Sequence, residues 1–219
     1  RSANQAKRNA NDGISLIQTA EGGLSEMSNI IIRLRELGIQ AASDTVDTEE
    51  RSFINAEVDQ LKNEMQRISD STTWGKTKLL DGSTPQFDFQ VGIFNDDFAD
   101  RISFDSSVNV ATTDALGLSG LSFLDKVGAQ GGLESLDDAQ VEVNRMRANL
   151  GALQNRLEST VANLGSTGEN LSAANSRIRD TDIAEATANL TSNQILMQAN
   201  TATLAQANQK NSLALQLLG

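Results

Sequence analysis

The side chains in this sequence that could take part in chemistry are mainly carboxylates and amides. The 219 residues include 29 Asp and Glu and 18 Lys and Arg, but neither Cys nor His. Thiol nucleophiles, disulfides, zinc fingers and histidine acid–base catalysis are therefore excluded. What remains is chemistry by oxygen ligands or by paired carboxylates.

Oxygen-bearing side chains gather at Asn95, Asp96, Asp97 and Asp100. Such a cluster could hold calcium, but it lacks the spacing and the turn glycine of a calcium-binding loop, and Asn and Asp commonly form turns. We therefore interpret it as a turn. A carboxylate-based hydrolase is a second possibility, and it would need two acids converging in a pocket. Because the acids lie mostly on predicted helix faces, we expect no enzyme, no metal and no cofactor.

The charge and hydropathy patterns exclude other classes of function. The formal net charge of −11 would repel nucleic acid at long range. No segment approaches the roughly 18 consecutive apolar residues of a membrane span, and no segment of the secretory-signal type stands at the start. We expect neither nucleic-acid binding nor membrane insertion.

With 4% aromatic residues and one Pro, the composition of the chain suits long helices rather than a thick globular core. Two long helices are predicted in the first third of the chain. The first covers residues 3–43 and is weakened at Gly13, Gly22 and Gly23. The second covers 46–71, with Asp44 and Thr45 as its N-terminal cap. Apolar residues at three-four spacing mark the buried side of the first helix: Ile17, Ala20, Leu24, Met27, Ile31, Leu34 and Ala41.

The pattern then changes to alternation, which predicts a β-hairpin over residues 86–105. Five of the seven Phe lie between Phe87 and Phe104. Since an isolated two-stranded ribbon is only marginally stable, we expect the hairpin to bury an aromatic face on the helices. Residues 106–133 read as a connection rich in Gly, Ser and Thr.

Helical periodicity returns over residues 135–179, with Ser135 as the expected N-terminal cap. A helix of this length with a single apolar side needs a partner along its whole length. We therefore predict a mainly α protein: a long antiparallel, coiled-coil-like helical bundle with a small β-hairpin region at one end, residues 1–180 forming a rod-like core domain. The apolar side of this helix consists of Ala139, Val143, Met146, Leu150, Leu153, Leu157, Leu164, Leu171 and Ile178.

Residues 181–219 differ from the rest because they are amphipathic without a charged face. Helices that face solvent normally present Lys and Glu, so we interpret this segment as a helical assembly segment that other chains enclose. Without such a partner we expect it to be disordered. The residues expected to bind neighbouring subunits or a chaperone are Leu190, Ile195, Leu196, Leu204, Leu213, Leu217 and Leu218.

Several long motifs carry a resemblance to a known family. NRMRANLGALQNRLESTVANL, then SRIRDTDIAEATANLT, then LAQANQ resemble the C-terminal half of bacterial flagellin. RLRELGIQAAS and INAEVDQLKNEMQRIS, followed by LLDG and FQVG, are similar to its N-terminal half in the same order. The resemblance covers essentially the whole chain, in a minimal form without variable outer domains and without the N-terminal arm that pairs with the C-terminal segment in this family. We expect a trimmed or processed chain.

The resemblance implies a structural subunit of the flagellar filament, which self-assembles into a helical tube for swimming motility. It also implies export through the flagellar type III apparatus, an extracellular location in the filament, other flagellin subunits as partners and a flagellin export chaperone. A hook–filament junction protein of the flagellum is the alternative.

The resemblance further points to one surface, which we name the recognition patch. It resembles the region bound by the Toll-like receptor that senses flagellin, and recognition by that receptor is the hypothesis. Contact with a neighbouring subunit in the filament is an equally good interpretation. The patch consists of Arg33, Arg35, Glu36, Leu37, Gln40 and Glu57.

Overall fold

The computed structural model describes residues 2–83, 86–179 and 183–218, with the side chains of all these except Arg179 and 211–218. The described elements, in chain order, are α1 (Ser2–Ala41), α2 (Thr48–Ser71), β1 (Thr73–Trp74), β2 (Thr77–Lys78), β3 (Gln86–Gln90), β4 (Arg101–Asp105), α3 (Lys126–Arg179) and α4 (Ile183–Leu218). The prediction of a mainly α protein with a small β-hairpin region is confirmed.

The chain divides into two compact units between Gly168 and Glu169. The predicted boundary between residues 180 and 181 lies outside the described residues. The division into a rod-like domain and an assembly segment therefore stays a prediction.

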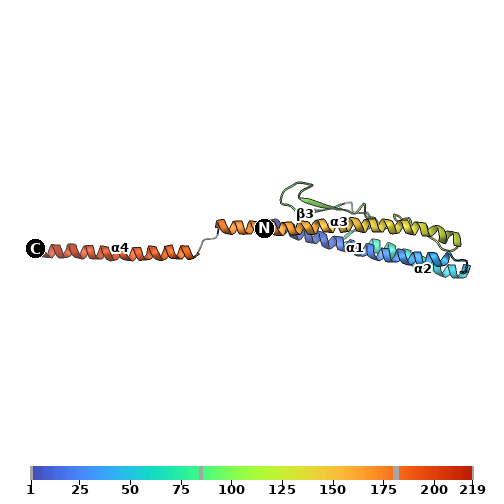
Figure 1. Ribbon diagram of the computed structural model, residues 1–219, viewed down its shortest axis with the longest axis horizontal. Coiled ribbons are helices and arrows are strands. Elements are labelled where there is room, and N and C mark those ends of the chain that lie inside the picture. Colours follow the sequence, from blue (N-terminus) through green and yellow to red (C-terminus); the bar gives the residue numbers. More distant parts are fainter. Residues whose placement is uncertain (1, 84–85, 180–182, 219) are drawn as a thin grey trace. The chain divides into compact units, whose positions relative to one another are not determined.

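In the first unit, α1 lies beside both α2 and α3 (Figure 1). The α1–α2 pairing is antiparallel, since Arg51 near the start of α2 reaches the Ala41 carbonyl whereas Thr72 after its end lies at Gly23. The α1–α3 pairing is also antiparallel, since Arg35 reaches Asp137 and Glu21 reaches Arg147. Leu24 is fully buried and Leu153 packs against the core. The apolar side of α3 is buried or half-buried as far as Leu164, whereas Leu171 and Ile178 beyond it are exposed. The largest fully buried side chains are Phe104, Phe123, Leu16, Ile17, Leu24, Met27, Ile31, Leu34, Met65, Leu79, Leu80 and Leu118.

Three glycines of α1 make room for other segments. A Cβ on Gly13 would lie 3.1 Å from the ring of Phe89, and one on Gly38 would lie 3.0 Å from Leu133 and 3.1 Å from Phe123. A Cβ on Gly23 would meet the Thr72 hydroxyl at 2.7 Å. We expected Gly13 and Gly23 only to weaken the helix, but the structure shows that they are close-packing positions.

The predicted helix boundaries need two corrections at N-termini. The cap of α2 is Asp47: its side chain accepts from the Glu50 amide at 2.8 Å, and Glu50 accepts from the Asp47 amide. We expected Asp44 to cap this helix. Instead both of its carboxylate oxygens accept hydrogen bonds from the ammonium of Lys126 at 2.8 Å. This pairing lowers the pKa of Asp44 through the hydrogen bond and the charge of Lys126.

The N-terminus of α3 is the second correction. The helix begins at Lys126 rather than at 135, because Asp125 accepts from the Gly128 amide at 2.6 Å and caps the helix earlier. The connection is correspondingly shorter, 106–125 instead of 106–133. Gly132 sits inside the early turns, where a Cβ would lie 2.5 Å from Leu121.

The predicted hairpin is confirmed: β3 and β4 pair antiparallel, with Phe87 opposite Phe104 and their ring centroids 5.9 Å apart. Phe104 is buried, but Phe94 and Phe98 are 74% and 88% exposed. Our expectation for the aromatic face is therefore wrong for these two, because they lie in the loop between the strands and outside the ladder. A second small hairpin, β1 with β2, was not predicted.

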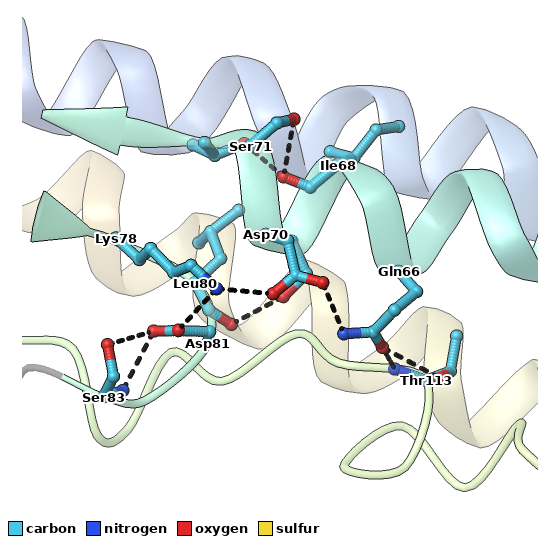
Figure 2. A network of polar contacts seen from close by, with 11 residues as sticks. Gln66, Ile68, Asp70, Ser71, Lys78, Leu80, Asp81, Ser83 and Thr113 are labelled. Atoms are coloured by element: carbon cyan, nitrogen blue, oxygen red, sulfur yellow. Dashed lines mark hydrogen bonds and ion pairs between the residues drawn. The ribbon is translucent and has the colours of Figure 1, made fainter. Parts of the chain in front are cut away.

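A polar network joins the end of α2 to the residues after β2 (Figure 2). Lys78 lies between Asp70 at 2.8 Å and Asp81 at 3.4 Å. Gln66 donates to Asp70 at 3.1 Å and accepts from Thr113 at 3.0 Å. The hydrogen bond from Lys78 lowers the pKa of Asp70. Burial raises the pKa of Asp81, but hydrogen bonds from Ser83 and Lys78 outweigh it and lower that pKa overall.

The second unit contains the end of α3 and all of α4. α4 is a continuous helix, although we expected this segment to be disordered without a partner. Its described side chains, 183–210, are exposed except for the half-buried Ala186. Among the described residues, no helix is both long enough and apolar enough to cross a membrane.

Candidate assembly and recognition surfaces

The recognition patch is built around Arg33 on the exposed side of the α1–α2 pair. Its guanidinium lies 3.0 Å from Glu36, one turn further along α1, and 2.9 Å from Glu57 on α2. The hydrogen bond from Glu57, followed by the one from Glu36, raises the pKa of Arg33. About half of the Arg33 side chain remains exposed, so a partner can reach this charged cluster.

The other patch residues lie apart from this cluster or behind it. Arg35 pairs with Asp137 of α3 at 2.9 Å, on the side of α1 away from α2. Gln40 is exposed, but Leu37 is only 3% exposed and belongs to the core. The structure therefore brings together Arg33, Glu36 and Glu57, whereas Leu37 can act on a partner only by holding α1 in place.

Exposed apolar residues near this patch were missed by the sequence analysis. Phe53 is 66% exposed and precedes Glu57 on α2 by one turn. Ile32 and Ile39, one heptad apart on α1, are 50% and 58% exposed. The signal was present, because Phe53 directly precedes the buried Ile54 and therefore cannot share its face.

The expected assembly segment is the second surface. Leu190, Ile195, Leu196 and Leu204 are between 57% and 64% exposed. Leu213, Leu217 and Leu218 lie outside the residues whose side chains are described. Two further residues, Ile183 at 72% and Met197 at 64%, complete a series at seven-residue spacing. We call this series, Ile183, Leu190, Met197 and Leu204, the α4 heptad row.

A second face of α4 carries small residues. Ala184, Ala188 and Thr191 recur at three-four spacing and line a shallow open hollow together with Thr187, Ser192, Ile195 and Leu196. Small side chains allow another helix to approach closely. α4 therefore offers two different faces for packing.

The acidic loop has the geometry of a turn. Asp96 accepts from the backbone amides of Phe98 at 2.9 Å and Ala99 at 2.8 Å, which lowers its pKa. Asn95 and Asp97 both accept hydrogen bonds from the guanidinium of Arg101. In the described part of the chain, no group of three or more acidic side chains is arranged to hold a metal ion.

Comparisons with known proteins agree on one family. Residues 1–84 match the family described as bacterial flagellin N-terminal helical region, and residues 133–218 match the bacterial flagellin C-terminal helical region. The flagellin of Halalkalibacterium halodurans is 41% identical over 218 residues, which is all of this chain and 79% of that protein.

Two solved structures are similar in fold. Bacillus cereus flagellin aligns with a TM-score of 0.64 at 28% identity, over 77% of this chain and 94% of that one. A putative flagellar hook-associated protein from Vibrio parahaemolyticus aligns with a TM-score of 0.63 at 12% identity, over 78% of this chain and 89% of that one. The second likeness shows the fold alone.

The two family regions thus cover α1, α2, most of α3 and α4, and the match to the Halalkalibacterium flagellin extends over the whole of this chain, including the hairpin. The chain belongs to the bacterial flagellin family and is a structural subunit of the flagellar filament.

Proposed function

We propose that this chain assembles with copies of itself through α4 and through the recognition patch, without catalytic activity. The exposed α4 heptad row is the observation that carries the proposal. Four large apolar side chains at one spacing, each 58% to 72% exposed, favour helix–helix contact over solvation.

The charge distribution on α4 supports the same role. Between residues 183 and 210 the charged residues are Glu185 and Lys210, whereas Asn, Gln, Thr and one Ser occupy the remaining polar positions. A helix exposed to water in its working state would be expected to carry more charge. Within a filament, where neighbouring helices cover it, such a surface needs less solvation.

The same α4 surface is the proposed binding site of a flagellin export chaperone. Before assembly, exposed Leu190, Ile195, Leu196 and Leu204 would promote aggregation unless a partner covered them. Chaperone and neighbouring subunit would then compete for one surface. Addition of a purified flagellar chaperone should slow polymerisation and should protect α4 amides from hydrogen exchange; protection confined to the first unit would contradict this assignment.

The test of assembly is filament formation by the full chain followed by electron microscopy. Replacing Leu190 and Leu204 together by Ser should abolish or strongly slow filament formation. The matched control is Val127→Ser, which makes an exposed apolar residue of α3 polar outside the α4 surface. Normal filaments from the α4 variant would refute the role of α4.

The recognition patch is proposed to serve both a neighbouring subunit and the flagellin-sensing Toll-like receptor. Arg33→Ala removes the cation that joins Glu36 to Glu57 and should weaken receptor binding. Arg145→Ala is the matched control, because Arg145 forms a similar exposed pair with Glu142 on α3. Unchanged receptor binding by Arg33→Ala would count against recognition; unchanged polymerisation would count against the subunit contact.

The proposed location is outside the cell, in the filament, after export through the flagellar type III apparatus. The absence of Cys suits a chain that crosses compartments without forming disulfides. In cells that lack the export apparatus, the chain should remain intracellular. Its appearance in the medium of such cells would rule out this route.

A hook–filament junction protein is the alternative function, but the Vibrio protein shares only the fold with this chain, and the flagellin relatives favour the filament subunit. The two functions differ in one measurable property. A filament subunit grows into long tubes, whereas a junction protein stops after a short ring or cap.

A further inference from the structure

The four methionines of the chain lie in two contrasting environments. Met27, Met65 and Met146 belong to the core of the first unit and are at most 2% exposed. Met197 lies on α4 and is 64% exposed. An exposed thioether reacts with oxidants directly, whereas a buried one becomes accessible only when the surrounding structure opens. Because the chain has no Cys, Met197 is the sulfur that an oxidant in solution meets first.

Met197 occupies the third of the four positions in the α4 heptad row. Leu190 precedes it and Leu204 follows it by one heptad, so another helix packed on this row would contact all three side chains. A thioether suits such a contact, because it is apolar and adapts its shape to its neighbours. The Leu and Ile side chains of the row have no atom of comparable reactivity. Met197 alone among them can be changed from apolar to polar by oxidation.

The reaction at Met197 needs only a peroxide as co-reactant. A lone pair of the Sδ atom attacks one oxygen of hydrogen peroxide and the O–O bond breaks. The attacked oxygen stays on sulfur as a sulfoxide, and the other leaves as water. The sulfur loses two electrons and the peroxide gains two. The product is a polar, chiral side chain in place of a flexible apolar one.

We propose that Met197 is an oxidation site through which peroxide prevents assembly of the free chain. This role rests on the proposed assembly of the chain through α4. In the free chain the sulfoxide oxygen faces water and costs little. In a helix–helix contact between Leu190 and Leu204 it would be buried among apolar groups, which is unfavourable without a hydrogen-bond donor.

The residues one helical turn from Met197 strengthen this difference between free and assembled chain. The hydroxyl of Thr201 already donates to the Met197 carbonyl at 3.0 Å. The other donors at this spacing are the side-chain amides of Asn193, Gln194 and Asn200. They can donate to a sulfoxide oxygen on the same exposed helix. Oxidation therefore leaves α4 itself intact and acts on its contact with other chains.

The first part of the test compares the four methionines in the folded, unpolymerised full chain. After brief treatment with hydrogen peroxide and digestion, mass spectrometry gives the rate of sulfoxide formation at each position. Met197 should be oxidised at least about tenfold faster than Met27, Met65 and Met146. In preformed filaments the oxidation of Met197 should slow by a similar factor, because a neighbouring helix covers it.

The second part measures assembly of the oxidised chain. Its critical concentration for polymerisation should rise by roughly tenfold, and treatment with methionine sulfoxide reductases of both stereospecificities should restore the original value. Met197→Leu keeps the row apolar without sulfur, and this variant should assemble equally well before and after peroxide. The matched control adds Val127→Met to Met197→Leu, which places an exposed methionine on α3 instead. Its oxidation should leave polymerisation unchanged.

Three results would overturn the proposal: equal polymerisation by the chain oxidised at Met197, oxidation of Met197 as slow as that of the buried methionines, or equal oxidation of Met197 in filaments and in the free chain. Failure of the proposed function is a separate observation. It would appear in the untreated chain, as normal filaments from the variant with Leu190→Ser and Leu204→Ser.

Discussion

Helices α1 and α4 are similar in length, 40 and 36 residues, but they use their apolar residues differently. In α1 most apolar residues lie on one face, and fourteen residues of the helix are buried, although Ile32 and Ile39 are exposed. In α4 they are spread around the helix, and its described large apolar side chains are all more than half exposed. The comparison teaches that the arrangement of apolar residues, rather than their number, separates a helix that folds within its own chain from one that requires other chains.

The largest expected difference between the two helices is in hydrogen exchange. Amides near Leu24 and Met27 should exchange only when the first unit opens globally, several orders of magnitude more slowly than amides near Leu190 and Leu196. The α4 amides are protected only by local helix formation, which is marginal in isolation. Measuring exchange on the free chain and on filaments checks this prediction. Strong protection of α4 in the free chain would remove the contrast.

The second largest difference between the two helices should be the effect of a Leu→Ala substitution on the free energy of unfolding. Leu24→Ala should lower the free energy of unfolding of the first unit by about 2–5 kcal/mol, since the side chain is fully buried. Leu190→Ala should change it by no more than about 0.5 kcal/mol, since that side chain is 58% exposed. Urea denaturation followed by circular dichroism measures both, and equal effects would contradict the comparison.

Glycine substitutions in α1 should have opposite signs. Gly38→Leu should destabilise the first unit by about 1–3 kcal/mol, because the new side chain must displace Leu133 and Phe123. Gly22→Ala should stabilise it by about 0.4–1 kcal/mol, since a Cβ there meets nothing within 4 Å. Thermal unfolding of both variants is the measurement. A stabilising Gly38→Leu would mean that the site is not closely packed.

The smallest expected effect concerns the Asp70–Lys78–Asp81 network. The pKa values of Asp70 and Asp81 are lowered on folding, so their stabilisation is present above the unfolded-state pKa of about 4 and disappears as the pH falls through the folded values. At pH 7, Asp81→Asn should reduce stability by at most about 1 kcal/mol, and the difference should shrink as the pH falls below the unfolded-state pKa. Paired urea titrations of wild type and variant at pH 7 and under acidic conditions decide this. A difference that does not shrink in acid would show that packing, not charge, holds Asp81.

The helices and the hairpin could be predicted because their periodicity is local. The three-four spacing from Ile17 to Ala41 and the alternation from Phe87 to Phe104 each reflect one buried face. The N-terminus of α3 was misplaced because Asp125 and Ser135 are both acceptable caps, and the choice depends on Gly132 packing against Leu121 and Phe123. No periodicity records such a contact.

The candidate site was less predictable than the fold. The Arg33–Glu36 pair follows from helix spacing, but Glu57 joins it only because α2 folds back on α1. Leu37 was assigned to the recognition patch from the family motif, although its burial places it in the core. Phe94 and Phe98 look like core residues by type, and only the loop geometry shows that they are exposed.

The three close-packing glycines of α1 restrict how this helix can vary in length. Gly13, Gly23 and Gly38 receive three different segments: the hairpin, the end of α2 with the residues after β2, and the connection. One inserted residue would turn everything beyond it by about 100° and advance it by about 1.5 Å. An insertion between Gly23 and Gly38 would thus displace the connection from its contact while leaving the hairpin in place, so evolution can change the residues of α1 far more freely than their number.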